Sequence, residues 1–356
     1  MSRTRGMGRA RALGVEVVMG MRAIRVREFG GPEALVAEQV ADPVAGAGQL
    51  VVGMAAADII FLDTLLRTGW GGEYFPLKPP YVPGGGGAGW VLSVGEGVDP
   101  GWIGRLVLAR GTGGYAERMI AEVEDTVEVP DGVTPVRAAA LLHDGVTAQM
   151  LVGEGRIERG EWVLIAAAAG GAGSLLVQLA REAGARVIAA ARGERKLALA
   201  RELGAEIAVD YSVPGWQGRV VEATGGAGVD LAYDGAGGPL GREVFETVAK
   251  GGRFVTYGTS SGLADIDPHL AKRRGVTVTN SLESGSPGTE EVRNLLTTAL
   301  TRTARGGLRP VIGATYPLER AADAHLALAR RETVGKSLLL IRPDAQPLPG
   351  VGSTVA

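Results

Sequence analysis

The chain has 356 residues, with 37 Lys and Arg against 39 Asp and Glu, and a formal net charge of -2. This near-neutral charge gives no basic field for nucleic acid or for an anionic membrane surface. The chain has no cysteine, which excludes disulfides, thiolate nucleophiles and cysteine-ligated metal sites. No apolar run approaches the ~20 residues of a membrane-spanning helix. We therefore predict a cytoplasmic protein that acts on small molecules, without nucleic-acid or membrane partners.

The first twenty residues differ in character from the rest of the chain. They contain four arginines and no continuous apolar run, unlike a secretion signal. Strand-like alternation begins abruptly at Met21. We expect residues 1–20 to be a disordered extension, or the product of a start codon assigned too early.

Short strands dominate the chain from Met21 to about Leu142. Runs such as "QLVVGMAA" and "GRLVLAR" are four to eight residues long and are separated by Gly, Pro and Asp. This pattern is typical of an all-β, barrel-like domain. We assign it to residues 21–143.

The spacing of apolar residues changes from Asp144 onward. Apolar β-runs such as "EWVLIAAA" alternate with segments of helical spacing such as "SLLVQLAREAG". Alternating strands and helices predict βαβ units and a doubly wound parallel sheet, here over residues 144–310. The fold class is therefore α/β, and the Pro/Gly-rich residues 346–356 are expected to form a flexible tail.

A glycine cluster lies in "AAAAGGAGSLLVQLA", between a predicted strand ending at Ala168 and a predicted helix. Gly170 permits a tight turn, Gly171 lets a phosphate approach the main chain, and Gly173 allows close helix packing. The N–H groups at the start of the helix can then bind a pyrophosphate. In this βαβ context, the cluster predicts a dinucleotide-binding site.

The residues after the second strand of this domain indicate which dinucleotide binds. NAD-binding sites usually place an Asp or Glu there, whereas this chain has Ala191, followed by Arg192 and Lys196. Cations at this position suit the 2′-phosphate of NADPH, so we predict NADPH rather than NADH. Alternatively, the two cations are only the solvated start of a helix, with Glu194 diluting their charge.

Together these motifs resemble the zinc-free quinone oxidoreductase branch of the medium-chain dehydrogenase/reductases, which includes zeta-crystallin-like proteins. The resemblance extends from about Met21 to Pro343. It implies a GroES-like β-barrel catalytic domain, residues 21–143 completed by 311–345, with the Rossmann domain inserted between. It also implies an oligomer, for which we expect a homodimer. The motifs that carry it are "DTLLRTG", "PYVPGGGGAG", "LLHDGVTA", "AAAGGAG", "YDGAGG", "YGTSSG" and "VGKSLLL".

The resemblance also implies further cofactor-binding residues. Tyr211 would join Arg192 and Lys196 around the adenosine phosphate, although it could equally just close the third strand. The nicotinamide end would be lined by Thr147, Gly235, Ala236, Gly258, Thr259 and Gly335. The glycines in this set could instead be turn residues only.

The zinc ligands of related dehydrogenases are missing from the corresponding positions. In zinc-dependent relatives a Cys opens the helix after the third strand, and a His–Glu pair follows a "PG" sequence; the positions here correspond to Ala57, Gly85 and Gly86. The resemblance therefore implies no metal site and disfavours zinc-alkoxide chemistry. Many quinone oxidoreductases have Asn at the position of Ile60 and Gln at the position of Asp144. Because these positions border the substrate end, the resemblance does not imply a particular substrate.

Hydride transfer to a quinone or to the activated C=C bond of an α,β-unsaturated carbonyl suits a site without metal. Thr147 could stabilise the resulting oxyanion. We expect Tyr74 or Tyr81 to donate the proton, although solvent could supply it instead and both tyrosines could simply pack within their loop. His143 and Asp144 are further donors near the predicted cleft, with a structural role the commoner outcome for such a histidine.

The sequence leaves two alternatives to this function open. One is a biosynthetic reductase or cyclase that acts on a single enone intermediate. The other is a nucleotide-binding structural or sensor protein without enzymatic activity.

Overall fold

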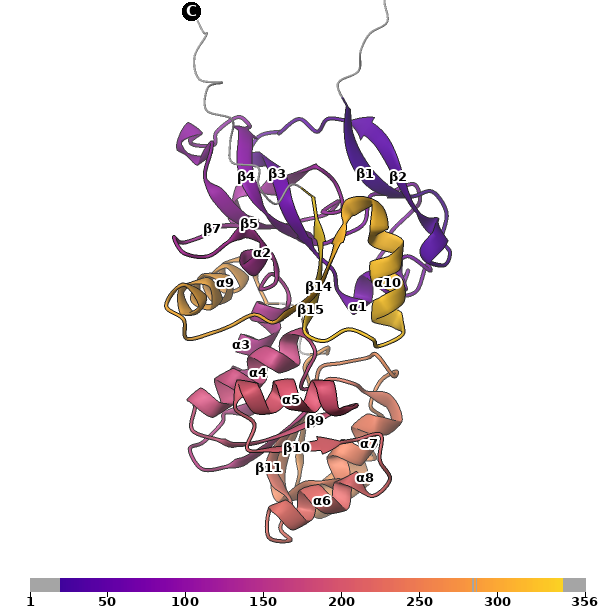
Figure 1. Ribbon diagram of the computed structural model, residues 1–356, viewed down its shortest axis with the longest axis vertical. Coiled ribbons are helices and arrows are strands. Elements are labelled where there is room, and N and C mark those ends of the chain that lie inside the picture. The colour runs from indigo at the N-terminus through magenta and orange to yellow at the C-terminus, as the bar shows by residue number, and fades with distance from the viewer. Residues whose placement is uncertain (1–19, 284, 286, 342–356) are drawn as a thin grey trace, which may run out of the picture.

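The computed structural model describes residues 20–283, 285 and 287–341. The predicted N-terminal extension, except Gly20, and the predicted C-terminal tail lie outside the described residues. Figure 1 shows a β-rich part above an α/β part. We call these the β domain (residues 20–143 and 312–341) and the α/β domain (residues 144–282). Among the helices described, none is long and apolar enough to cross a membrane.

The β domain combines strands from both ends of the chain. Strand β15 lies between β14 and β3, antiparallel to β3, with Leu338 opposite Asp58. The pairing continues through β4 and β5 to β7, β6 also pairs with β3, and β1 and β2 form a separate pair. The strands are β1 (Gly20–Val26), β2 (Leu35–Ala41), β3 (Gln49–Asp58), β4 (Gly86–Val94), β5 (Leu106–Arg110), β6 (Arg118–Glu122), β7 (Thr126–Glu128), β14 (Ile312–Pro317) and β15 (Lys336–Leu340).

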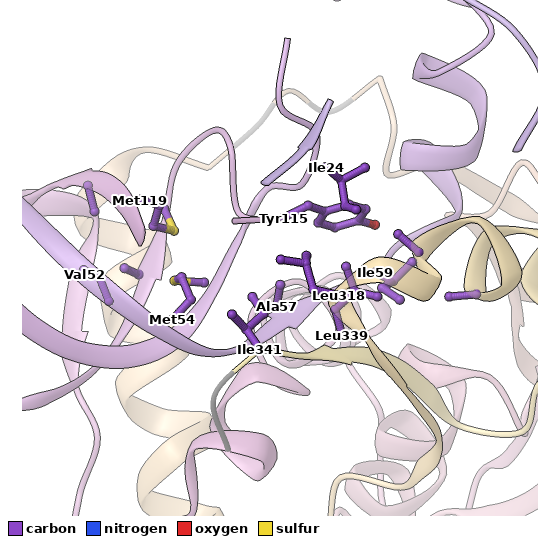
Figure 2. Close-up of a cluster of buried hydrophobic side chains, with 14 of the residues drawn as sticks. Ile24, Val52, Met54, Ala57, Ile59, Tyr115, Met119, Leu318, Leu339 and Ile341 are labelled. Atoms are coloured by element: carbon purple, nitrogen blue, oxygen red, sulfur yellow. The ribbon is translucent and has the colours of Figure 1, made fainter. Parts of the chain in front are cut away.

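One hydrophobic core holds these distant segments together. Ile24, Met54 and Tyr115 from the N-terminal part pack with Leu318 and Leu339 from the C-terminal part, all nearly or fully buried (Figure 2). Each such side chain contributes roughly 1.5–3 kcal/mol by leaving water. The C-terminal segment is therefore an integral part of the β domain.

The α/β domain is built on a six-stranded parallel sheet in the order β10-β9-β8-β11-β12-β13. Along β8, Val163 and Ile165 pack with one cluster of helices, whereas Leu164 and Ala166 pack with another. Such alternation means that helices cover both faces of the sheet, which confirms the predicted doubly wound α/β fold. The strands are β8 (Trp162–Ala166), β9 (Arg186–Ala191), β10 (Ile207–Asp210), β11 (Val229–Asp234), β12 (Val248–Thr256) and β13 (Thr277–Asn280).

The helices of this domain fall on opposite faces according to these two clusters. Those on one face are α3 (Asp144–Gly155), α4 (Gly171–Glu182) and α5 (Glu194–Leu203), and those on the other are α6 (Trp216–Ala223), α7 (Gly238–Glu246) and α8 (Pro268–Arg274). The remaining α-helices are α1 (Phe61–Leu66), α2 (Pro135–Ala139), α9 (Thr289–Ala304) and α10 (Ala321–Ala329). Short 3₁₀ helices are η1 (Pro32–Ala34), η2 (Pro100–Trp102), η3 (Val123–Asp125) and η4 (Leu318–Arg320).

Helix α9 joins the two domains. Its buried Leu296 and Leu300 pack in a cluster with Ala56 and Leu108 of the β domain and Leu175 of α4. The helix also contacts α3, β7 and η3, and it lies beside the β-rich part in Figure 1. This shared core fixes the two domains against each other.

Candidate active site

The candidate site lies at the carboxyl ends of β8 and β11. The chain runs outward from β8 to β10 and then returns to place β11 on the other side of β8. In doubly wound sheets, ligands bind at such a reversal. A segment of the β domain closes over it, since the Gly335 N–H donates a 2.7 Å hydrogen bond to the Ala169 carbonyl. The candidate site therefore lies where the two domains meet.

The glycine turn has the geometry that its sequence predicts, with a small shift. Strand β8 ends at Ala166, two residues earlier than expected, and α4 begins at Gly171 with Gly170 as its N-cap. A Cβ atom on Gly173 would lie 2.4 Å from the Ala167 carbonyl oxygen. Only glycine lets α4 approach the turn this closely, and the first turn of α4 presents backbone N–H groups at a position suited to an anion.

The predicted adenosine-phosphate residues lie together. Burial lowers the pKa of Lys196, and the positive charges of Arg192, Arg331 and Arg195 lower it further. Burial raises the pKa of the neighbouring Tyr211, an effect that Arg192 and Arg331 oppose. The three guanidinium groups and the half-buried lysine repel one another. A bound anion would relieve that repulsion.

Arg331, which comes from the β domain after α10, was not predicted from the sequence. Its guanidinium donates 2.9 Å hydrogen bonds to the Ser260 carbonyl and the Ser261 hydroxyl, and its own carbonyl accepts from Lys196 Nζ at 2.9 Å. The basic pair "RR" before "ETVGK" was visible in the sequence. Nothing local indicated that it would meet Lys196, which lies 135 positions earlier.

Asp210, an acid near this cluster at the end of β10, binds backbone N–H groups. It accepts hydrogen bonds from the N–H groups of Gly193 and Ser212 at 2.9 and 2.8 Å. The hydrogen bond from the Ser212 side chain lowers the pKa of Asp210 most, outweighing the opposing effect of burial. The carboxylate therefore fixes the loop that carries Arg192.

The predicted nicotinamide residues come from loops that touch each other. Asp234 accepts hydrogen bonds from the N–H groups of Ala236 (3.0 Å) and Gly237 (2.9 Å). A Cβ atom on Gly258 would lie 2.0 Å from the Gly235 carbonyl oxygen, so the loops after β11 and β12 are in contact. Thr259 comes next in the second loop, and Gly335 is placed by its bond to the glycine turn.

Thr147 lies on α3, whose first residue contacts the glycine turn. A Cβ atom on Gly171 would come within 1.9 Å of Asp144 Oδ2. Burial raises the pKa of Tyr257, a residue not singled out from the sequence, and the charges of Asp234 and Asp144 raise it further. The start of α3 thus lies against the glycine turn.

A buried network of charges lies beside the start of α3. Lys336 is 4% exposed and forms ion pairs with Asp58 and with Asp144, the latter at 3.0 Å. His143 Nδ1 lies 2.6 Å from Asp58 Oδ2. Burial would raise the pKa of Asp58, but the charge of Lys336 and the interactions with His143 outweigh it and lower that pKa. This network was not predicted from the sequence.

The two predicted tyrosines have different surroundings. Tyr74 is 81% exposed on the loop after α1. The ring of Tyr81 packs against the β-domain core, and its hydroxyl is buried without a hydrogen-bond partner in the described part of the chain. Burial raises the pKa of Tyr81, and the charge of Asp63 adds to this effect. The structure does not bring the two phenols together.

The assignment of Ala57 to the missing cysteine position needs correction. Ala57 lies within β3 and packs in the hydrophobic core shown in Figure 2, whereas α1 begins at Phe61 with Ile60 as its N-cap. The residue that opens the helix is therefore Ile60, because β3 continues further than the sequence suggested. Ile60, Gly85 and Gly86 all lack a metal-binding side chain.

Comparisons with known proteins cover most of the chain. Residues 46–131 match the alcohol dehydrogenase GroES-like domain family, and residues 171–322 match the zinc-binding dehydrogenase family. The first match confirms the predicted GroES-like domain. The second family name refers to zinc, although this chain has no cysteine.

Curated relatives match over nearly their whole length. The chain is 32% identical over 331 residues to a 2-haloacrylate reductase from a Burkholderia species, covering 90% of this chain and 99% of the relative. It is 31% identical to a quinone oxidoreductase from Pseudomonas aeruginosa, with the same coverage. A mycobacterial protein solved in complex with NADPH superimposes with a TM-score of 0.83 at 34% identity, covering 90% of this chain and 100% of that one.

Proposed function

Because this chain belongs to the quinone oxidoreductase branch of the medium-chain dehydrogenase/reductase family, we propose that it is an NADPH-dependent reductase of quinones or of activated C=C bonds. NADPH, when bound, supplies the hydride. The chain's own residues bind the cofactor, hold the acceptor in the proposed site and stabilise the charge that develops on oxygen. The single observation that carries the proposal is the cluster of cations formed by Lys196 and the three arginines around it.

The cation cluster supports NADPH over NADH. The 2′-phosphate distinguishes the two cofactors, and charge-assisted hydrogen bonds from Arg and Lys are the usual way to bind it. Arg192, Arg195 and Lys196 follow β9 at the position where NAD-binding sites place an acid, and Arg331 approaches from the other domain. The nearby acid, Asp210, already accepts hydrogen bonds from backbone N–H groups of the loop. The mycobacterial relative was solved with NADPH, which agrees with this proposal.

The charges at the other end of the proposed site favour an uncharged acceptor. Lys336 is already paired with two carboxylates, those of Asp58 and Asp144. An anionic acceptor could pair with Lys336 only by displacing one of these carboxylates. A quinone or an enone carbonyl carries no charge before the hydride arrives. The Burkholderia relative's name nevertheless refers to a haloacrylate, so an acrylate belongs in the test.

Stopped-flow measurement of NADPH oxidation tests the proposal. We expect turnover with 1,4-benzoquinones or cyclic enones, weaker turnover with 2-chloroacrylate, and slower rates when NADH replaces NADPH. Tight NADPH binding without turnover of any acceptor would favour the non-enzymatic alternative. Turnover of one specialised enone only would favour the biosynthetic reductase.

We also propose that the protein is a homodimer. Strand β13 is an edge of the parallel sheet, and Val278 on it is 39% exposed. Such an edge leaves unpaired backbone groups that a second copy can pair with. Light scattering of the protein and of Val278→Lys tests this; a monomeric wild-type protein would refute it.

A further inference from the structure

We propose that His143, held in place by Asp58, donates the proton that follows hydride transfer to the acceptor. This inference rests on the proposed function, since it names the acid of that reaction. From the sequence alone, a structural role was the expected one for this histidine.

His143 lies where the two domains meet. It is the N-cap of α3, and its carbonyl accepts a 2.9 Å hydrogen bond from the N–H of Thr147, one turn further on. The next residue, Asp144, touches the glycine turn at Gly171. The His143 side chain is 30% exposed, so solvent reaches it. His143 thus lies between the predicted cofactor site and the β domain.

The orientation of the imidazole is fixed from one side only. Nδ1 lies 2.6 Å from Asp58 Oδ2, and Asp58 is fully buried and held by Lys336. Nε2 makes no hydrogen bond to any part of the chain that the structure describes. It faces Gly85, where a Cβ atom would lie 2.9 Å from Nε2 and 2.7 Å from Cε1. A glycine at position 85 is therefore what makes room for the ring.

Charged side chains surround the ring. The groups that face it are Asp58 on β3, Lys336 on β15 and Asp144 on α3, with Asp63 of α1 close enough to interact electrostatically. Asp58 and Asp144 carry two negative charges against one positive charge on Lys336. An imidazolium at His143 makes this group of four side chains neutral overall. A buried carboxylate that orients and stabilises an imidazolium is the arrangement used by histidine acids and bases.

Atoms and electrons balance in the proposed step. The enone receives a hydride from NADPH at its β-carbon, and the electron pair of the C=C bond moves to give an enolate. The Nε2–H bond of His143 breaks and a C–H bond forms at the α-carbon, with the electron pair left on Nε2. Neutral His143 keeps its Nδ1–H bond to Asp58, and water reprotonates Nε2. With a quinone, the same proton goes to an oxygen of the hydroquinone.

The experiment uses 2-methylcyclohex-2-enone, whose α-carbon becomes a stereocentre when it is protonated. We expect His143→Gln to lower kcat by about 10²-fold, the lower end of the range for lost general-acid help, and to give a mixture of α-epimers where the wild type gives one. NADPH affinity should stay unchanged, which also reports that the variant is folded. Gly85→Ala displaces the ring without altering Asp58 and should cause the same losses. Asp58→Asn should reduce kcat and the excess of one epimer, as expected for a positioning residue.

His269→Gln is the matched control, because His269 is exposed on α8; it should change nothing. If His143→Gln and Gly85→Ala keep both kcat and the single epimer, the inference is wrong. Loss of kcat and of the single epimer in Tyr74→Phe or Tyr81→Phe, with His143→Gln unaffected, would assign the proton to tyrosine and also overturn it. If the wild type reduces no enone or quinone at all, it is the proposed function that fails.

Discussion

The two ends of the proposed site use charge in opposite ways. At the adenosine end, cations gather near the surface: Arg192 is exposed, Lys196 is half-buried, and the neighbouring charges that shift the pKa of Lys196 are all positive. At the acceptor end, Lys336 and Asp58 are buried and paired, with Asp144 and His143 completing the network. Exposed charges of one sign are suited to a ligand that brings the opposite charge. Buried, paired charges position a reactive group instead, and breaking such a pair is costly. The difference predicts where mutations will change stability and where they will change affinity.

The largest expected effect comes from breaking the buried network. Lys336→Met leaves Asp58 and Asp144 without their cation, and such a loss typically costs about 3–5 kcal/mol of unfolding free energy. Urea unfolding followed by tryptophan fluorescence measures it. The control is Arg302→Ala, which breaks an exposed ion pair with Glu182 and should cost less than about 1 kcal/mol. Equal effects of the two variants would contradict this difference between buried and exposed charges.

A second buried carboxyl, Asp63, predicts a pH dependence of stability. Burial raises its pKa to about 6 despite hydrogen bonds from the Ile60 N–H and the Tyr115 hydroxyl. Because the folded protein holds this proton more tightly than the unfolded chain, the stabilisation is full below about pH 4 and is lost as pH rises through about 6. A shift of about two pKa units corresponds to about 3 kcal/mol. We expect Asp63→Asn to remove this contribution, measured as the difference between wild-type and variant unfolding free energies from pH 4 to pH 7. A difference that stays constant over this range would refute it.

At the adenosine end the expected effect is on affinity. Lys196→Ala and Arg331→Ala should each weaken NADPH binding by about 1.5–3 kcal/mol, roughly 10- to 150-fold. NADH binding should hardly change, and unfolding free energies should move by no more than about 0.5 kcal/mol. Fluorescence titration with both cofactors measures this. Equal losses of affinity for NADPH and NADH would contradict the assignment of these cations to the 2′-phosphate.

The smallest expected effect is that of chelation. The protein has no cysteine, and Ile60, Gly85 and Gly86 cannot bind zinc, so prolonged EDTA treatment should leave kcat unchanged. Elemental analysis should find far less than one zinc per chain. A stoichiometric zinc needed for turnover would mean that the acceptor end works as a metal site and not through its side chains.

The cluster of cations around Lys196 was largely predictable from the sequence, and the buried network around Lys336 was not. Arg192 and Lys196 directly follow an apolar strand, so the strand's own periodicity placed them at the carboxyl edge of the sheet. Asp58, His143 and Lys336 belong to three segments that no local pattern connects. Their meeting depends on β15 pairing with β3, which is a consequence of tertiary packing. Arg331 was missed for the same reason.

Errors in the predicted elements arose at strand ends. The run "MAAAD" continues β3 to Asp58, so Ala57 faces the core and Ile60 takes the position before α1. Alanine and glycine carry little signal for where a strand stops, and β8 likewise ended two residues before its predicted end. Helical and strand periodicity predicted the class of both domains because that signal is summed over many residues.

The placement of β15 has a consequence for how the protein is made. Residues Lys336–Leu340 fill the space between β14 and β3, yet the ribosome adds them after the whole α/β domain. Until they emerge, one side of β3 has no neighbour along Ala56–Asp58, and the core around Ile24 and Tyr115 lacks Leu339. An uncovered strand edge beside exposed apolar side chains attracts other chains and chaperones. The β domain, although its strands β1 to β7 precede the α/β domain in the chain, can therefore be completed only after the inserted α/β domain has been synthesised.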